Sequence, residues 1–437
     1  MLDIELIRKN PNLVKENLKK HFKENLIELV DKILEIDNKW RSIIKELNNL
    51  RKERNKISRE YAKTKNENLL KKANELKEKI EKLETEEKKL KEERDELLKH
   101  LPNILHEDVP IGKDESENVP IRYFGKVKVA KDKIEEFKKE FGNLEFEIVE
   151  KTYNHYELME GKVINSFKAA QVSTSRFYYM FDKVVKLWLA LIHYGLDFLE
   201  KRNYKIVYVP DMLRRQIEES ATHFSDFEEM IYKIENEDLY LIPTAEHAIL
   251  ALHFNEIIEE EKLPLKYAGI SVCFRKEAGA HGKDTKGIFR VHQFDKVEQF
   301  IFSKPEESWK MFEELIKNAE EFYQSLNIPY RVVNICSGEI GYVAAKKYDL
   351  EAWFPGQNKF REIVSCSNCT DWQARRANIR LRRKDGSIEF VHTLNSTLVA
   401  VQRTICAIFE NFYDEKSKCI VIPKPLVKYT EFEFIEL

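Results

Sequence analysis

The sequence predicts an α+β protein in which an N-terminal antiparallel coiled-coil hairpin precedes a body with a mainly antiparallel sheet flanked by helices. Three observations support this fold class. The first hundred residues carry two apolar heptad seams that mirror each other. A segment rich in proline and glycine follows the second seam. Beyond it, short apolar runs alternate irregularly with amphipathic stretches, which is typical of an antiparallel sheet covered by helices.

The two seams occupy residues 33–61 and 69–97, and their positions step alternately by three and four residues. Pairing Ile33 with Leu97 also pairs Tyr61 with Leu69, so we expect the chain to fold back about Lys65. Each arm of about 29 residues then spans about 42 Å. The first seam is Ile33, Ile36, Trp40, Ile43, Leu47, Leu50, Arg54, Ile57 and Tyr61, and the second is Leu69, Ala73, Leu76, Ile80, Leu83, Glu87, Leu90, Arg94 and Leu97.

Three charged residues, Arg54, Glu87 and Arg94, interrupt the apolar seams. Long charged side chains often bury their stems along apolar surface while their heads reach water. We therefore expect the heads of these three residues to be solvated. A role in fixing the register of the two helices is the second interpretation.

The outer half of the hairpin is basic. From Arg41 to Lys72 the chain has eleven Lys or Arg residues and four Glu residues, a net charge of 11 − 4 = +7. Such a run is often only a solvated face. Cations held at a fixed reach on a stiff arm are also what binding to a nucleic-acid backbone requires. The candidate nucleic-acid contacts are Arg51, Arg54, Arg59 and Lys63.

Composition excludes several classes of protein. The chain has 437 residues, 43% hydrophobic and 34% charged, with a formal net charge of −2. It has no secretory-signal pattern at its start and no apolar run of about 18 residues, so we expect no membrane partner. The six cysteines are few for this length, which favours a cytoplasmic location.

Only Cys366 and Cys369 have the spacing of metal ligands, as CSNC. A structural zinc site normally needs a second such pair or a pair of histidines. The sequence supplies neither, so we expect no zinc.

The body carries no Walker A loop, no GxGxxG and no GxSxG elbow. The body instead carries a series of charged and polar fragments. In chain order they are TAE at 244–246, FRKE at 274–277, GIFRVHQF at 287–294, Glu298, EIVS at 362–365, and LNST at 394–397 ahead of Arg403. Each fragment alone is weak, because an isolated Arg-x-Glu is usually surface decoration.

Taken in order, these fragments resemble the seryl-tRNA synthetases of class II. The similarity covers nearly the whole chain. The most specific blocks are FRKEAGAHGKDTKGIFRVHQFDKVEQF and REIVSCSNCTDWQARRANIR, joined by the linker VPIGKDESEN and the stretch FKAAQVSTSRFYYM. The resemblance implies a tRNA-binding arm at residues 1–105 and a class II catalytic domain at residues 106–437.

The resemblance also implies a reaction in which serine attacks ATP to give seryl-adenylate, and the seryl group then passes to tRNA. Arg275 matches the arginine that bridges the serine carboxylate and the α-phosphate, and its planar fork suits two anions. Arg403 would cover one face of the adenine and reach the γ-phosphate, and Phe294 would cover the other face. The implied catalytic pair is Arg275 and Arg403, and the implied ATP set is Arg275, Lys276, Glu277, Arg290, Val291, Phe294, Glu362, Ile363, Val364, Ser365 and Arg403.

The serine-binding set implied by the resemblance is Thr244, Ala245, Glu246, Arg275, Glu298 and Thr397. A site built to hydrogen-bond a hydroxyl can reject the analogue lacking it by about 10⁴ or more. Glu298 and Thr397 would meet the ammonium and hydroxyl of serine. Glu362 and Ser365 match the family's Mg²⁺ ligands, and oxygen donors suit that hard cation.

The implied partners are ATP, L-serine, tRNA(Ser) and a second copy of the chain, and charging of tRNA(Sec) stays open. Pro210 matches the proline that lies at the family's dimer interface. Three stretches depart from the family or do not match it: the glycine-less loop at 220–227, the variant GEIG at 338–341, and the charged segment at 126–153.

Three other functions remain as alternatives: a catalytically inactive paralogue that only binds, a homologue that aminoacylates a carrier protein and would lack the arm, and a coiled-coil scaffold. The last leaves the ordered motifs of the body unexplained. The first is disfavoured by an intact set of residues: Arg275, Glu277, Glu298, Glu362, Ser365 and Arg403.

Overall fold

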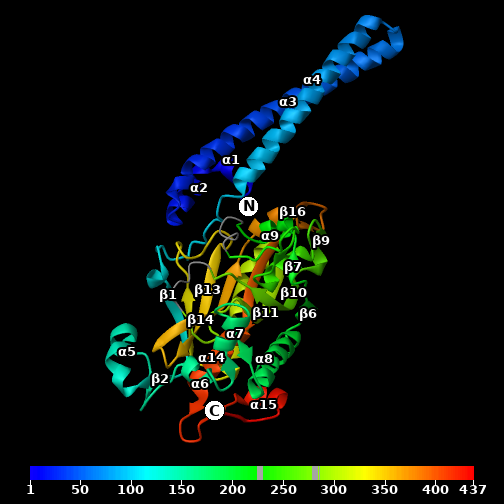
Figure 1. Ribbon diagram of the computed structural model, residues 1–437. Helices are drawn as coiled ribbons and strands as arrows, with labels where there is room; N and C mark the ends of the chain where they lie inside the picture. The colour runs from blue at the N-terminus through cyan, green and yellow to red at the C-terminus, as the bar shows by residue number, and fades with distance from the viewer. Residues whose placement is uncertain (224–229, 278–283, 285) are drawn as a thin grey trace. The chain divides into compact units, whose positions relative to one another are not determined.

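The structure, a computed structural model, describes residues 1–223, 230–277, 284 and 286–437 (Figure 1). Residues 224–227 of the glycine-less loop therefore lie outside the described residues. The chain divides into two compact units, Met1–Ile104 and Leu105–Leu437, which are described separately below.

The first unit is entirely helical. Two long helices form a hairpin, and two short helices pack against its base through the buried side chains of Ile7, Val14 and Val30. The elements are α1 (Ile4–Lys9), α2 (Pro11–Lys20), η1 (Glu24–Leu26), α3 (Ile27–Thr64) and α4 (Glu67–Leu98).

The hairpin turns where the mirrored seams predict. Lys65 ends α3 in the left-handed conformation, with φ at 57°, and the Asn66 side chain caps α4 by accepting from the Asn68 N–H. Contacts along the pair follow the predicted antiparallel order: Trp40 Nε1 donates to Glu87 Oε1 at 2.7 Å, and Arg51 pairs with Glu84 at 2.7 Å. The prediction of an antiparallel coiled-coil hairpin is confirmed.

The prediction that the head of Arg94 reaches solvent is wrong. Its guanidinium is buried and donates to Asp37 Oδ1 at 2.9 Å, while its Cζ lies 4.6 Å from the centre of the Trp40 ring. Asp37 also accepts two hydrogen bonds from Arg8 of α1, each 2.7 Å long. A buried carboxylate outside the apolar seam thus gives Arg94 a partner, which seam periodicity alone does not reveal.

The second unit contains the sheets. Its helices are η2 (Glu115–Glu117), η3 (Lys131–Lys133), α5 (Ile134–Phe141), α6 (His155–Met159), α7 (Ser166–Val172), α8 (Lys183–Glu200), α9 (Arg215–Ala221), α11 (Ala245–Ala251), η4 (Glu260–Lys262), η5 (Pro305–Glu307), α12 (Ser308–Ser325), α13 (Trp372–Ala377), α14 (Val401–Phe412) and α15 (Lys424–Thr430).

Its strands are β1 (Val119–Phe124), β2 (Val127–Ala130), β3 (Phe146–Val149), β4 (Ile164–Asn165), β5 (Tyr179–Met180), β6 (Lys205–Tyr208), β7 (Met212–Leu213), β8 (Tyr240–Leu241), β9 (Ile257–Glu259), β10 (Leu265–Phe274), β11 (Gln293–Ser303), β12 (Tyr330–Asn334), β13 (Lys346–Phe354), β14 (Lys359–Asn368), β15 (Arg380–Arg382), β16 (Ile388–Phe390), β17 (His392–Ala400), β18 (Tyr413–Asp414), β19 (Cys419–Val421) and β20 (Phe434–Glu436).

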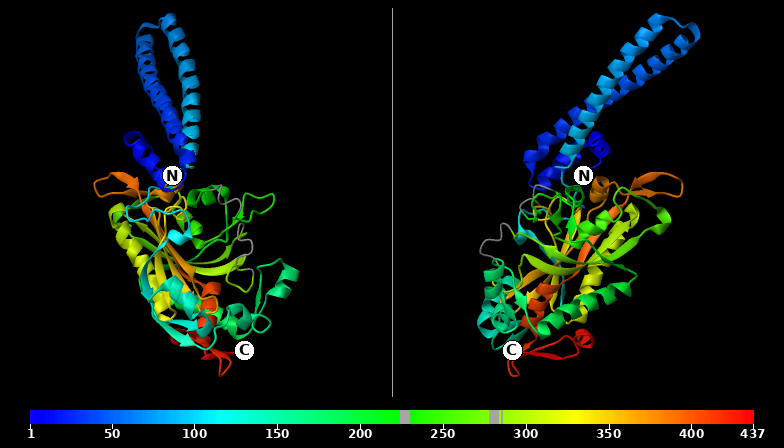
Figure 2. Two further views of the ribbon diagram at one scale, coloured as in Figure 1. Left: turned by 90° about the vertical axis from the view of Figure 1, so that its left-hand side faces the viewer. Right: turned by 45° about the vertical axis from the view of Figure 1, so that its right-hand side comes forward.

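An eight-stranded sheet in the order β1-β12-β13-β14-β17-β11-β10-β6 organises this unit. Figure 2 shows the ribbon of the sheet and its helices from two further sides. Every neighbouring pair in the sheet is antiparallel except β10 and the edge strand β6. The main apolar core joins the sheet to α8, α12 and α14, with Leu187, Phe312 and Phe409 among its buried members. The predicted α+β class with an antiparallel sheet flanked by helices is therefore confirmed.

The charged segment at 126–153 forms a small β-α-β substructure within the second unit. β2 and β3 run parallel and are joined by α5. Phe137 of α5 is fully buried and meets Trp353 of β13 edge-on, with ring centroids 5.5 Å apart. The segment is thus anchored to the main sheet by aromatic packing, and Lys128 and Lys133 donate to the Asn411 and Gly356 carbonyls, each at 2.7 Å.

None of the helices in the described ranges is long and apolar enough to cross a membrane.

The Asp37 cluster yields a prediction for the first unit. Replacing Asp37 with Asn should cost about 3 kcal/mol locally, because Arg8 and buried Arg94 lose their shared buried counter-ion and keep only the more exposed Glu5 and Asp95. Burial raises the pKa of Asp37, but the hydrogen bonds from the two arginines outweigh it and hold that pKa below 3.8. A carboxyl group whose pKa is lower in the folded chain than in the unfolded chain stabilises the fold at pH values above its unfolded pKa. The contribution of Asp37 to stability is therefore present at neutral pH and is lost as the pH falls through the folded pKa.

Hydrogen–deuterium exchange of the full chain measures this effect. In Asp37→Asn at pH 7, backbone amides of α1 and of the last turns of α4 should exchange faster, and those near Lys65 should not change. Glu35→Gln is the matched control, since Glu35 pairs with Lys39 on an exposed face where such a pair contributes little. Equal exchange in α1 for both variants would contradict a structural role for the cluster.

Candidate active site

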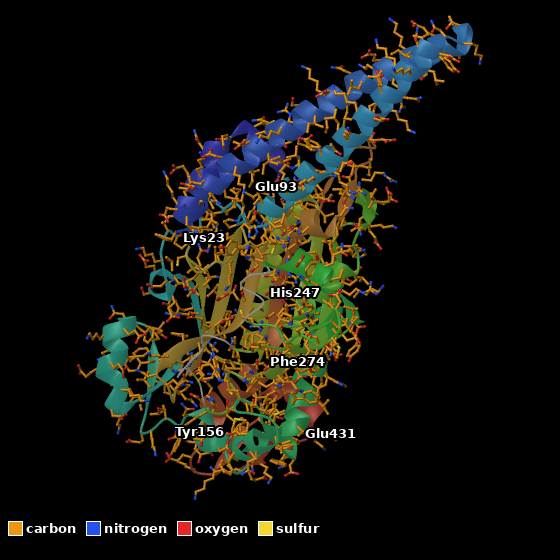
Figure 3. All side chains as sticks on the ribbon, turned by 45° about the horizontal axis from the view of Figure 1, so that its top comes forward. Lys23, Glu93, Tyr156, His247, Phe274 and Glu431 are labelled. Carbon is orange, nitrogen blue, oxygen red and sulfur yellow. The ribbon has the colours of Figure 1, made fainter. Side chains whose placement is uncertain are left out.

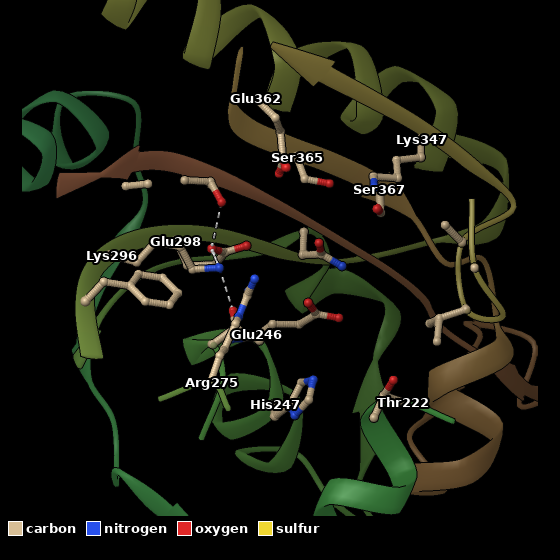
Figure 4. A pocket seen from close by; sticks show the side chains of 18 of the residues that line it. Thr222, Glu246, His247, Arg275, Lys296, Glu298, Lys347, Glu362, Ser365 and Ser367 are labelled. Carbon is tan, nitrogen blue, oxygen red and sulfur yellow. Dashed lines mark hydrogen bonds and ion pairs between the residues drawn. The ribbon is translucent and has the colours of Figure 1, made fainter. Parts of the chain in front are cut away.

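One face of the eight-stranded sheet opens into a cavity of about 330 Å³ (Figure 4). Glu246, Arg275, Lys296 and Glu298 gather on one side of it, and Glu362 and Ser365 lie on the side formed by β14. The predicted site residues that line the cavity are Thr244, Glu246, Arg275, Glu277, Arg290, Val291, Phe294, Glu298, Glu362, Ile363, Ser365, Thr397 and Arg403.

Three predicted residues do not line this cavity. Ala245 and Val364 are buried in the apolar cores on either side of the sheet. Lys276 is exposed, and its backbone N–H donates to the Met230 carbonyl at 2.8 Å.

Strand β11 supplies a row of side chains to the cavity. Because alternate residues of a strand share a face, Phe294, Lys296 and Glu298 all point into it. Gln299, the next residue, faces the other way and donates to the Leu315 carbonyl of α12 at 3.2 Å. The strand therefore places an aromatic ring, a cation and a carboxylate in a line.

The polar groups at the Glu298 end form a buried network. Lys296 Nζ lies 2.5 Å from Glu298 Oε2 and 2.7 Å from Thr244 Oγ1. A register shift between β11 and β17 sets Thr397 directly opposite Glu298, and Thr397 Oγ1 donates to Glu298 Oε2 at 3.4 Å. These contacts tie together β11, β17 and the residue that precedes α11.

Glu246 completes this end of the cavity. The Thr244 hydroxyl caps α11 by accepting from the Glu246 N–H. The Glu246 carboxylate accepts from Gln373 Nε2 at 2.7 Å, and Gln373 in turn accepts from the Thr393 hydroxyl at 2.6 Å. The carboxylate is thus held by a buried amide whose own orientation is set by a hydrogen bond.

The charges at this end act on one another. Burial raises the pKa of Glu298, the neighbouring Lys296 and Arg275 lower it, and the like charge of Glu246 raises it, with a net upward shift. Glu298 therefore needs the neighbouring cations in order to stay ionised at neutral pH.

Arg275 follows directly after β10. Its Nε donates to the Pro243 carbonyl at 3.3 Å, and its guanidinium lies 5.2 Å from the centre of the Phe294 ring. Two further residues of the predicted ATP set contact each other: Arg290 Nη1 donates to Glu277 Oε2 at 3.0 Å. Glu277 adopts a left-handed φ of 51°, which is uncommon for a residue with a side chain and often marks functional positions.

The opposite wall carries Glu362 and Ser365 on β14. Residues three apart on a regular strand face opposite sides, but a bulge between β13 and β14 makes Ile363 an extra residue and turns Glu362 to the face of Ser365. Arg403 Nη1 donates to the Glu362 carbonyl at 2.9 Å and lies 3.3 Å from its carboxylate. Burial raises the pKa of Glu362, and Arg403, Lys347 and Arg275 outweigh it, lowering the pKa to about 2.

This wall has the donors that a hard cation requires. It offers the ionised carboxylate of Glu362 and the hydroxyl of Ser365 on one face. Asp349 lies opposite Ser365 on β13, and its Oδ1 is buried without a hydrogen-bond partner among the described residues. Within the described ranges, no three His, Cys, Asp or Glu side chains come together as a metal site. The residues fit a cation that also takes oxygens from a bound substrate.

Several residues of the cavity are absent from the sequence-based set. Lys296 could have been found from its two-residue spacing to Phe294 and Glu298, which places it on their face. Lys347 lines the cavity from β13, which lies outside the predicted fragments. Phe289 also lines it and precedes Arg290 in the GIFRVHQF block, but it is not in the predicted set. Gln373 supports Glu246 from α13, and only the tertiary structure brings the two together.

The predicted nucleic-acid contacts of the first unit lie along the end of α3, where the stick view shows side chains projecting from both long helices (Figure 3). Arg59 and Lys63 are exposed, and Arg54 is half-buried. Arg51 is exposed as well but pairs with Glu84 of α4.

Two family profiles match parts of the chain. A family profile described as "Seryl-tRNA synthetase N-terminal domain" matches residues 1–105. A profile described as "tRNA synthetase class II core domain (G, H, P, S and T)" matches residues 228–412.

Individual relatives match the whole chain. A serine–tRNA ligase from Pyrococcus horikoshii is 54% identical, and the alignment covers 100% of this chain and 97% of the relative. The crystal structure of seryl-tRNA synthetase from Pyrococcus horikoshii complexed with ATP matches with a TM-score of 0.95, covering 100% of this chain and 99% of that one. That of the cytoplasmic serine–tRNA ligase from Naegleria fowleri in complex with AMP is 40% identical, with a TM-score of 0.86 and coverage of 100% and 99%. The chain therefore belongs to the seryl-tRNA synthetase family of class II aminoacyl-tRNA synthetases.

Proposed function

We propose that this chain activates L-serine with ATP and transfers the seryl group to tRNA(Ser). The single observation that carries the proposal is that one cavity brings together two acids, Glu246 and Glu298, and the cation Arg275, with Arg403 on the far wall. A zwitterionic amino acid needs both signs of charge at one end, and a nucleoside triphosphate needs cations beside it.

In the first step, the serine carboxylate oxygen attacks the α-phosphorus of ATP. A carboxylate–phosphorus bond forms, the bond to the β-phosphate oxygen breaks, and pyrophosphate leaves. Arg275 binds both anions and stabilises the charge on the phosphorus. Glu246 and Glu298 bind the ammonium, and Thr397 with Glu298 binds the hydroxyl, so the carboxylate is held facing the α-phosphate.

In the second step, the 3′-terminal hydroxyl of tRNA attacks the carbonyl carbon of the adenylate. The ester bond to tRNA forms, the hydroxyl proton is released, and AMP leaves. The basic outer half of the arm would hold the tRNA backbone by phosphate contacts. Charging of tRNA(Sec) by the same steps is tested by an aminoacylation assay in which tRNA(Sec) replaces tRNA(Ser).

For ATP binding, Arg290 and Arg403 would contact the terminal phosphate, and Phe294 would stack on the adenine while Glu277 reads its edge. Glu362 and Ser365 would hold Mg²⁺ together with phosphate oxygens of ATP. When bound, the cation neutralises phosphate charge during attack. The low pKa of Glu362 supports this assignment, because a metal ligand must be deprotonated.

We also propose a cytoplasmic homodimer. Strand β6 is an open edge of the main sheet, and its side chains Ile206 and Tyr208 are exposed, Tyr208 by 72%. Met212 and Pro210 continue this exposed surface. A second copy related by a two-fold axis would cover it. Sedimentation equilibrium should return the mass of two chains, and a one-chain mass at micromolar concentration would contradict the dimer.

The proposed activity is tested by ATP–pyrophosphate exchange that depends on serine. The wild-type chain should exchange with L-serine far faster than with alanine or threonine. Thr397→Ala should raise the KM for serine while leaving the KM for ATP nearly unchanged, because Thr397 lies at the Glu298 end. Absence of serine-dependent exchange in a folded, tRNA-binding protein would instead support an inactive paralogue.

The Mg²⁺ assignment makes a separate prediction. Glu362→Gln should raise the Mg²⁺ concentration for half-maximal exchange by at least about tenfold, since one charged ligand is lost. Ser367→Ala is the control, because Ser367 lines the same face of β14 and is not assigned to the cation. Identical Mg²⁺ titrations for Glu362→Gln and wild type would refute this assignment.

The arm makes the last prediction of this function. Replacing Arg59 and Lys63 with Gln should weaken tRNA binding and charging and leave serine-dependent exchange unchanged. The slope of log affinity against log salt should fall by about one per lost phosphate contact. Changing Lys88 and Lys91 near the base of α4 removes the same charge outside the basic half and should have a smaller effect. If both pairs of substitutions act alike, the basic tip is only a solvated surface.

A further inference from the structure

The buried ammonium of Lys296 has no role in the proposed reaction so far. Its side chain is 8% exposed and that of Glu298 is 2% exposed. Burying two ions is costly unless they pair closely and satisfy their remaining hydrogen bonds. Lys296 meets that requirement with two partners, and both belong to the serine-binding set implied by the sequence.

The position of Lys296 follows from the strand. It shares the cavity face with Phe294 and Glu298 because the three alternate along β11. Its neighbour Thr244 belongs to a different element, where it begins α11. The ammonium therefore connects the strand that carries Glu298 to the helix start that carries Glu246.

The charges at this end of the cavity are balanced only when Lys296 is counted. Two carboxylates, Glu246 and Glu298, face two cations, Arg275 and Lys296. A zwitterion such as serine adds no net charge, so the balance persists on binding. Without Lys296 this end of the cavity would carry one excess negative charge beside the buried Glu298.

We propose that Lys296 is a positioning residue for serine specificity, which aims the Glu298 carboxylate at the hydroxyl and ammonium of the substrate and ties it to Thr244. The proposal rests on the proposed function. Lys296 acts through Glu298 and not by contacting serine itself.

The electrostatic surroundings of Glu298 support this proposal. Burial raises the Glu298 pKa and Lys296 is the largest influence that lowers it. Loss of Lys296 should therefore raise this pKa further, so that the carboxyl takes a proton as pH falls toward neutrality. The titratable and charged groups around Glu298 are Lys296 on β11, Glu246 and His247 on α11, Cys273 on β10, Arg275 after β10, and Cys366 on β14.

The experiment compares Lys296→Met, Lys296→Arg and wild type in serine-dependent exchange between pH 6 and 9. Lys296→Met should raise the KM for serine by about tenfold or more with little change in the KM for ATP. It should also lower the preference for serine over alanine, since Glu298 no longer meets the hydroxyl in a fixed position. Its acid limb in kcat/KM for serine should lie at higher pH than in wild type, and Lys296→Arg should restore the wild-type limb.

Lys266→Met is the matched control. Lys266 lies on the neighbouring strand β10 and pairs with Glu314 of α12 at 2.7 Å on the other side of the sheet. Losing that ion pair should leave the KM for serine and the pH profile unchanged. Thermal unfolding of all variants shows whether each one folds.

A double-mutant cycle decides whether Lys296 acts through Glu298. In a Glu298→Gln background, Lys296→Met should change the KM for serine by less than about twofold, because the partner charge is already gone. Effects that multiply would overturn the proposal, as would a folded Lys296→Met with the wild-type KM, alanine preference and pH limb. These outcomes differ from failure of the proposed function, in which the wild-type chain itself shows no serine-dependent exchange.

Discussion

The candidate site depends on the alternation of side chains across the eight-stranded sheet. On β11, Glu298 faces the cavity while Gln299 faces the apolar side and α12. One face can therefore concentrate charge while the other joins a continuous core. Two irregularities interrupt the strict alternation of side chains at the site. The bulge at Ile363 turns Glu362 toward the cavity, and the register shift on β17 sets Thr397 opposite Glu298.

Charge placed on a buried face must be matched, and the cavity is organised by that requirement. Lys296 is shared between Glu298 and Thr244, Arg290 pairs with Glu277, and Arg403 contacts Glu362. Glu298, Glu277 and Glu362 thus each have a cation beside them, whereas Glu246 is held by the amide of Gln373. The site is thus held in shape before any substrate binds, which limits the reorganisation that binding requires.

The first unit is stabilised in a different way from the sheet-containing unit. A two-helix hairpin has a narrow apolar seam, and its base is joined to α1 by the buried cluster of Asp37, Arg8 and Arg94. Ion pairs farther along, such as Arg51 with Glu84, are exposed and contribute little to stability. A hairpin stabilised at its base can carry a strongly basic tip, because the repulsion there is solvated and does not act on the buried cluster.

The sequence by itself determined the hairpin, its turn at Lys65, the fold class of the body and the motifs that identify the family. These properties are carried by local period and by contiguous blocks, which one chain displays without its fold. The tertiary structure alone decided that Arg94 is buried, since its partner Asp37 lies 57 positions away. It also brought Gln373 to Glu246 and Asp349 to Ser365. Lys296 lies between the two cases: its face follows from β11 alone, but its bond to Thr244 exists only because α11 packs against that strand. Contacts between distant segments carry no periodic signal, and so the partners of buried charges appear only when the chain is folded.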